Sequence, residues 1–177
     1  MTGKLSAGKS RKLLPGLCSM LGTLFLAAVI AAFLPVTVPK LFGYQVYEVI
    51  SGSMEPEIPV GSAVYVKAAD PETVSEGEII AFWRRDSVIT HRVVENHQSA
   101  GEFITKGDAN SQEDMTPVPY EDLLGSVKLH IPVLGAVMAV LVGGTGKIYA
   151  ALLAVWGVML HIMAAILKAS GERKNGK

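Results

Sequence analysis

Residues 13–38 read LLPGLCSMLGTLFLAAVIAAFLPVTV, a run of 26 residues without a charged side chain. Lys12 and Lys40 bracket this run. About 20 apolar residues suffice for a helix to cross a bilayer. The sequence therefore predicts a transmembrane helix at 13–38, with Pro35 and Pro39 closing it.

A second uncharged run covers residues 148–167, and with the lysine on each side it predicts a second span at 147–168. Lysine and arginine gather in the two terminal tails, residues 1–12 and 169–177. Positive residues stay on the cytoplasmic side of membrane proteins. We therefore expect a multi-pass protein of the cell membrane with both termini in the cytoplasm and the middle of the chain outside.

A cleavable signal peptide is the alternative for the first run. The apolar core of such a peptide is usually about 7–15 residues long and ends at small residues. The run at 13–38 is longer and ends in proline-rich sequence. Its length and its end favour a retained anchor.

The composition excludes several classes of protein. With 50% hydrophobic and 18% charged residues the chain is too apolar for a typical soluble domain. Residues 41–146 hold six basic and fifteen acidic side chains, an acidic balance that argues against binding to nucleic acid. The single cysteine, Cys18, excludes a disulfide framework and a cysteine-based zinc site. No phosphate-binding glycine loop is present in the sequence, and we expect neither a metal nor a cofactor.

Between the spans, short apolar and β-branched runs alternate with clusters of Gly, Pro, Asp and Asn. The runs are 46–50, 63–66, 79–83, 88–94, 103–105 and 124–131. Short strands at this spacing predict a mainly β domain over 39–130, either a sandwich or a partly open barrel. Residues 131–146 are also uncharged, but they are short for a span and broken by Pro and Gly. We expect an interfacial segment there, with packing under the β domain as the alternative.

Polar side chains follow or interrupt three of the predicted strands. The sequence SGSMEP at residues 51–56 comes after the first of them. A turn of small residues can expose a hydroxyl to a substrate, although a solvated turn has the same composition. His91 lies inside the run at 88–94, where it is either a core histidine or a general base. Asp108 and Asp114 lie just beyond another predicted strand, the run at 103–105.

Together these stretches resemble the type I signal peptidases. The similar pieces are YEVISGSMEPEIPVGSAVYV, THRVV, FITKGDANSQED and LLGSVKLHIPVLG, in the same order and spacing from about residue 42 to 134. His91 stands where the common bacterial branch has a lysine base, so the resemblance is to the ER-type branch. That branch comprises the microsomal catalytic subunit, archaeal enzymes and a group from endospore-forming Gram-positive bacteria. A second membrane helix after the catalytic domain fits the last two groups.

The resemblance implies a serine endopeptidase that removes N-terminal signal peptides from secreted preproteins on the outer face of the cytoplasmic membrane. It implies Ser53 as the nucleophile, His91 as the general base and the Ser51 hydroxyl as part of the oxyanion hole. Asp114 aligns with the family aspartate that orients the histidine, and Asp108, in the KGD turn, is the other candidate. The expected partners are signal-peptide-bearing preproteins and membrane lipid, and no cofactor is implied.

Three alternatives stay open beside this interpretation. Lys106 could form a Ser-Lys dyad, but His91 stands at the family's base position. A non-enzymatic membrane-anchored β domain that binds an exported partner is the alternative function. A self-cleaving protease of the repressor type has a similar β fold, but the two spans and the acidic middle disfavour it.

Met54 and Pro56 are expected to line a pocket or to face the membrane.

Overall fold

The computed structural model describes residues 4–175, with the side chains of residues 13–171. Of the predicted basic tails, residues 1–3 and 176–177 therefore lie outside the described part of the chain. The chain divides into two compact units. One consists of the residues up to Leu34 and those from Leu141 onward, and the other is Pro35–Val140.

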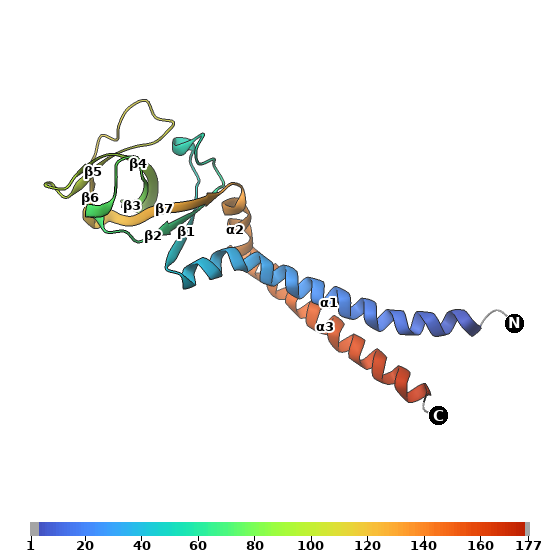
Figure 1. Ribbon diagram of the computed structural model, residues 1–177. Helices are drawn as coiled ribbons and strands as arrows, with labels where there is room; N and C mark the ends of the chain where they lie inside the picture. The colour runs from blue at the N-terminus through green and yellow to red at the C-terminus, as the bar shows by residue number, and fades with distance from the viewer. Residues whose placement is uncertain (1–3, 176–177) are drawn as a thin grey trace. The chain divides into compact units, whose positions relative to one another are not determined.

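The first unit consists mainly of two long helices, α3 (Gly144–Asn175) and the part of α1 (Lys4–Leu41) that precedes Pro35 (Figure 1). Within the described residues, two helical segments are long and apolar enough to cross a bilayer: Leu13–Leu41 and Gly144–Gly171. The two helices thus fit a membrane protein.

Small residues and one histidine form the contact between these helices. A Cβ atom added at Gly22 would lie 2.8 Å from the carbonyl oxygen of Gly157. His161 Nδ1 lies 3.4 Å from Ser19 Oγ, and His161 Nε2 lies 3.3 Å from Thr23 Oγ1. Close backbone approach at small residues, together with polar contacts, is typical of paired membrane helices.

The prediction that Pro35 and Pro39 close the first helix is wrong, because α1 continues through both prolines to Leu41. A proline cannot donate to the carbonyl four residues earlier. At Pro39 that carbonyl belongs to Pro35, and the hydroxyl of Tyr65 donates to it at 3.2 Å. The helix tolerates the missing bond there because the Tyr65 side chain, which belongs to the same unit as this end of α1, replaces it. Burial raises the pKa of the Tyr65 phenol, which keeps this donor protonated.

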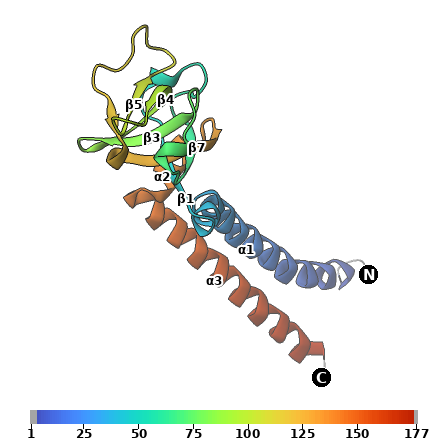
Figure 2. The same ribbon diagram turned by 60° about the vertical axis from the view of Figure 1, so that its left-hand side comes forward.

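The second unit is built on one antiparallel sheet in the order β1-β2-β7-β3-β4-β5-β6. Its strands are β1 (Tyr44–Glu48), β2 (Ala63–Lys67), β3 (Ile79–Arg84), β4 (Ser87–His97), β5 (Glu102–Lys106), β6 (Val118–Pro119) and β7 (Leu123–Ile131). The sheet is strongly curved (Figure 2), and register shifts at bulges in three of its pairings contribute to the bend. The edges at β1 and β6 leave the barrel partly open. The predicted fold class, a mainly β domain between two apolar helices, is confirmed.

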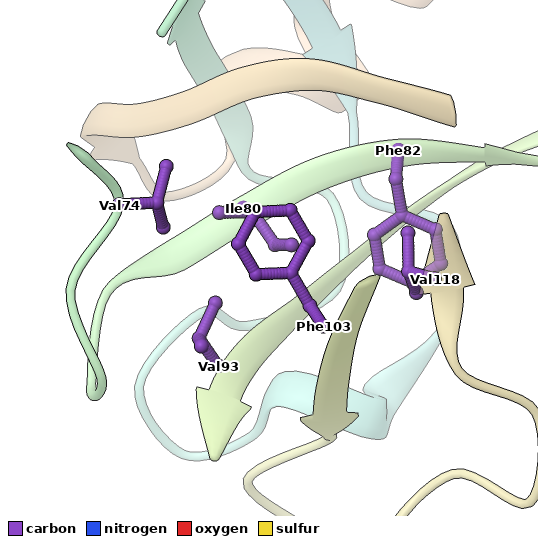
Figure 3. Close-up of a cluster of buried hydrophobic side chains, with 6 residues drawn as sticks. All are labelled: Val74, Ile80, Phe82, Val93, Phe103 and Val118. Carbon is purple, nitrogen blue, oxygen red and sulfur yellow. The ribbon is translucent and has the colours of Figure 1, made fainter. Parts of the chain in front are cut away.

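Two apolar clusters cover opposite faces of the central strand β3. Figure 3 shows the first cluster, in which Ile80 and Phe82 of β3 converge with side chains of the neighbouring segments. Its buried members are Val74, Ile80, Phe82, Val93, Phe103 and Val118. The second contains Met54, Ile58, Val64, Val66 and Ala81. Successive strand residues point to opposite faces, so β3 is buried on both sides. Met54 is only 1% exposed, so the expectation that it lines a pocket or faces the membrane is wrong.

The uncharged segment 131–146 contains a short helix, α2 (Leu134–Val142). Its first turn lies directly on the loop before β2. A Cβ atom at Gly135 would be 2.3 Å from the carbonyl oxygen of Ser62, and the Ala136 amide donates to Gly61 at 3.0 Å. Glycine is therefore required at this close approach, and the start of α2 packs against the β domain.

Candidate active site

Ser53 lies in η1 (Gly52–Met54), a single 3₁₀ turn that follows β1. The buried Met54 anchors this turn in the second apolar cluster. Ser51 is exposed and Ser53 is half-buried. Among the described side chains, neither hydroxyl is held by a hydrogen bond. The turn therefore presents two hydroxyls next to a fixed backbone.

His91 lies in the middle of β4, with its ring on the side of the first apolar cluster. The residue is 7% exposed, and its ring meets the Phe82 ring edge-on, with centroids 6.3 Å apart. Nδ1 lies 2.6 Å from Oδ2 of Asp114. An ionised carboxylate only accepts hydrogen bonds, so Nδ1 carries the hydrogen and Nε2 of the neutral ring keeps its lone pair.

Thr105 holds Asp114 in place from the neighbouring strand β5. Its hydroxyl donates to the same oxygen, Oδ2, at 2.6 Å, and the Asp114 amide donates to the Thr105 carbonyl at 2.8 Å. Thr105 is fully buried. The carboxylate beside His91 is thus fixed by a hydroxyl and by its own backbone.

Gly107 brings the histidine and the serine turn together. A Cβ atom added at Gly107 would lie 2.6 Å from the carbonyl oxygen of Ser53 and 3.0 Å from Nε2 of His91. The Ala109 amide also donates to the Ser53 carbonyl, at 2.9 Å. The free nitrogen of His91 therefore lies on the side of the ring where η1 packs, which is where a base for Ser53 is needed.

Asp108 contacts a different cation. Its two carboxylate oxygens accept from Nε and Nη2 of Arg92, at 2.8 and 2.6 Å. Arg92 follows His91 on β4, so the two side chains leave the strand on opposite faces. Lys106 pairs with Arg92 in the β4–β5 ladder and shares the face of Arg92 rather than that of His91. Of the two aspartates, Asp114 is the one beside the histidine.

Within the part of the chain that the structure describes, no group of three or more His, Cys, Asp or Glu residues could hold a metal ion.

Three residues of this arrangement were missed by the sequence reasoning: Arg92, Thr105 and Gly107. Arg92 could have been found from the alternation of side chains along β4 between the two faces of the sheet. Two consecutive polar residues on one strand must serve opposite faces, and two aspartates follow the neighbouring strand. The role of Gly107 had no local signal, because it depends on the approach of η1 from a distant part of the sequence.

A serine, a histidine and an aspartate gathered in this way form a candidate hydrolytic site of the Ser-His-Asp class, which recurs on unrelated folds.

The chain is similar to several curated proteins whose names describe them as signal peptidases or their catalytic subunits. It is 38% identical over 89 residues to signal peptidase I W of Bacillus subtilis, covering 48% of this chain and 47% of that protein. It is 31% identical over 121 residues to the human signal peptidase complex catalytic subunit SEC11C, covering 62% of each. It is 34% identical over 101 residues to the catalytic subunit SEC11 of Scheffersomyces stipitis, covering 50% of this chain and 60% of that protein.

The matched regions thus span about half of the bacterial relative and less than two thirds of the eukaryotic ones. No family model matches the chain. The similarity to one bacterial signal peptidase and to the SEC11 catalytic subunits agrees with the predicted resemblance to signal peptidases of the ER-type branch.

Proposed function

We propose that this protein is a membrane-anchored serine endopeptidase that removes N-terminal signal peptides from exported preproteins. The observation that carries the proposal is the position of His91. One ring nitrogen binds the Asp114 carboxylate at 2.6 Å, and the other lies against Gly107, which itself packs on the Ser53 carbonyl. The names of the similar proteins supply the substrate class.

In the proposed reaction, Ser53 Oγ attacks the scissile carbonyl while Nε2 of His91 takes its proton. The Ser53 amide and the Ser51 hydroxyl donate to the oxyanion that forms. His91 then gives the proton to the leaving amine, and the acyl-enzyme remains. A water molecule, deprotonated by His91, releases the acyl group and restores Ser53. Asp114 stays ionised throughout and stabilises the imidazolium.

The test of this proposal is cleavage of a purified preprotein by the full-length protein in proteoliposomes. Wild type should release the mature protein, and the mass of the product should locate one cut after the signal peptide. Ser53→Ala should release none. If both proteins leave the preprotein intact, or if Ser53→Ala cuts as well as wild type, the serine peptidase proposal is wrong. The non-enzymatic binding domain would then be the better description.

We also propose that both termini are cytoplasmic and that the β domain lies outside, on the basis of the basic residues in the two tails. In a Cys18→Ala background, an impermeant thiol reagent added to whole cells should label Glu72→Cys, an exposed position after β2. It should not label Lys9→Cys until the membrane is opened. The reverse pattern would contradict the topology and the location of the site.

The segment 131–146 is proposed to lie at the membrane interface. Val137 and Val140 of α2 are 45% and 69% exposed, while Gly135 on the same helix is buried against the β domain. A helix with one packed side and one exposed apolar side can rest in the headgroup region. Membrane lipid is then a partner of this segment as well as of the two spans.

A further inference from the structure

Arg92 uses three of its N–H groups to connect separate parts of the β domain. Nε and Nη2 form a bidentate pair with Asp108, at 2.8 and 2.6 Å. Nη1 donates to the carbonyl of Gly77, in the turn before β3, at 2.8 Å. Paired bonds between a guanidinium and a carboxylate fix both position and orientation. The guanidinium group of Arg92 therefore connects the Asp108 carboxylate to the backbone carbonyl of Gly77.

Asp108 belongs to a tight turn that contacts the backbone carbonyl of Ser53 and the ring of His91. The Asn110 amide donates to the Gly107 carbonyl at 2.9 Å and closes the turn. On one side of Asp108, Gly107 packs on the Ser53 carbonyl and on Nε2 of His91. On the other side, the Ala109 amide donates to the same Ser53 carbonyl. A movement of Asp108 must displace one or both of these contacts.

The ion pair between Arg92 and Asp108 is partly buried, so solvent weakens it less than it would weaken a fully exposed pair. The side chains of Arg92 and Asp108 are 35% and 18% exposed. Hydrogen bonding to Asp108 raises the pKa of Arg92 above its usual value, so the guanidinium stays charged. A lysine would keep the charge but could not form the two parallel bonds.

We propose that Arg92 is a positioning residue, which acts through Asp108 to hold the turn at residues 107–110 against the Ser53 carbonyl and so fixes the nucleophile relative to His91. Arg92 has no contact with the reacting atoms. This inference rests on the proposed peptidase function for its kinetic consequence, but the contact between the turn and Ser53 can be measured without any substrate.

Loss of the bidentate pair between Arg92 and Asp108 should displace the Ser53 nucleophile without changing substrate binding. A displacement of about 1 Å at a reacting group can cost about 100-fold in rate. We expect Arg92→Gln to lower kcat roughly 10- to 100-fold with little change in KM. Arg92→Lys should lower kcat nearly as much as Arg92→Gln does. Asp108→Asn should resemble Arg92→Gln, and the double variant should be no worse than either single one, because both changes break one interaction.

Lys128→Gln is the matched control. Lys128 forms a more exposed ion pair with Glu78, at 3.3 Å, in the same domain, and this pair does not contact the turn. Its loss should leave kcat within twofold of wild type. Cleavage of a purified preprotein and amide hydrogen exchange at Ala109 are both measured on the full-length protein in proteoliposomes.

The expected result is a loss of kcat in Arg92→Gln and Arg92→Lys, together with faster exchange of the Ala109 amide, while Lys128→Gln changes neither. Unchanged exchange at Ala109 in both Arg92 variants would overturn the proposal. Arg92 variants that cleave as fast as Lys128→Gln would overturn it as well. If wild type itself fails to cut, the peptidase function is wrong, and the exchange rates still decide whether Arg92 holds the turn. If Arg92→Gln fails to fold, Arg92→Lys carries the comparison.

Discussion

The acidic loop, residues 107–114, binds strand β4 at both ends, and the two ends differ in chemistry. At one end Asp114 meets His91, and at the other Asp108 meets Arg92. The two carboxylates are chemically alike, and the two cations are neighbours in sequence. A histidine can gain or lose a proton near neutral pH, whereas an arginine stays charged. The same loop can therefore serve proton transfer at one end and fixed geometry at the other.

Removing the proposed reacting groups, Ser53 and His91, should have the greatest effect. Ser53→Ala and His91→Ala should each lower kcat by at least about 10³-fold, and the double variant should be no slower than the worse single one, because the two groups act as a unit. Ser53→Ala should keep the unfolding temperature of wild type, whereas His91→Ala should stay folded but unfold at a lower temperature, because it removes the buried partner of Asp114. Cleavage rates and thermal unfolding check this. A near-normal rate for His91→Ala would remove the histidine from the mechanism.

A smaller effect is expected from the close contact between Gly107, at the Asp108 end of the loop, and the Ser53 carbonyl. Gly107→Ala places a Cβ atom 2.6 Å from the Ser53 carbonyl oxygen, so the turn or η1 must shift. We expect a fall in kcat of about 100-fold. Gly144→Ala is the control, since an added Cβ atom there meets nothing within 4 Å. Equal rates for the two variants would mean that the close contact at Gly107 is not needed.

The smallest effect is expected from the hydroxyl behind Asp114. Thr105→Val keeps the shape of the buried side chain and removes its hydrogen bond to the carboxylate. Loss of a hydrogen bond to a charged group should lower the free energy of unfolding by about 1.5–3 kcal/mol. The rate should fall less than in Gly107→Ala, and Thr105→Ser should restore part of both losses. Denaturant unfolding and cleavage rates measure the two effects, and a stability of Thr105→Val equal to wild type would contradict this role.

Much of the fold was predictable because its strands are buried on at least one face. Six of the seven strands overlap the predicted runs, since apolar and β-branched residues at strand spacing carry a strong signal. β6 was missed because it has two residues, one of them Pro119. The end of α1 was mispredicted for a tertiary reason, because the Tyr65 hydroxyl satisfies the carbonyl that Pro39 leaves without a donor.

The candidate site was predictable in its members but not in its connections. The turn with Ser53 and the strand with His91 each have a local signature. Asp108 and Asp114 follow the same strand within one loop, so their spacing alone does not assign either to the histidine. The folded sheet distinguishes them, because His91 and Arg92 leave β4 on opposite faces and each meets a different aspartate.

The pH dependence of kcat/KM for Asp114→Asn and Asp108→Asn tests whether the two ends of the acidic loop have different roles. A carboxylate beside an imidazole favours its protonated form, and the general base must be unprotonated. Removing the charge of Asp114 should therefore move the acidic limb of the profile to lower pH, besides lowering the rate at every pH. Asp108→Asn should lower the rate and leave that limb in place, since its partner is Arg92. A shifted limb for Asp108→Asn alone would contradict the account and would make Asp108 the partner of the histidine.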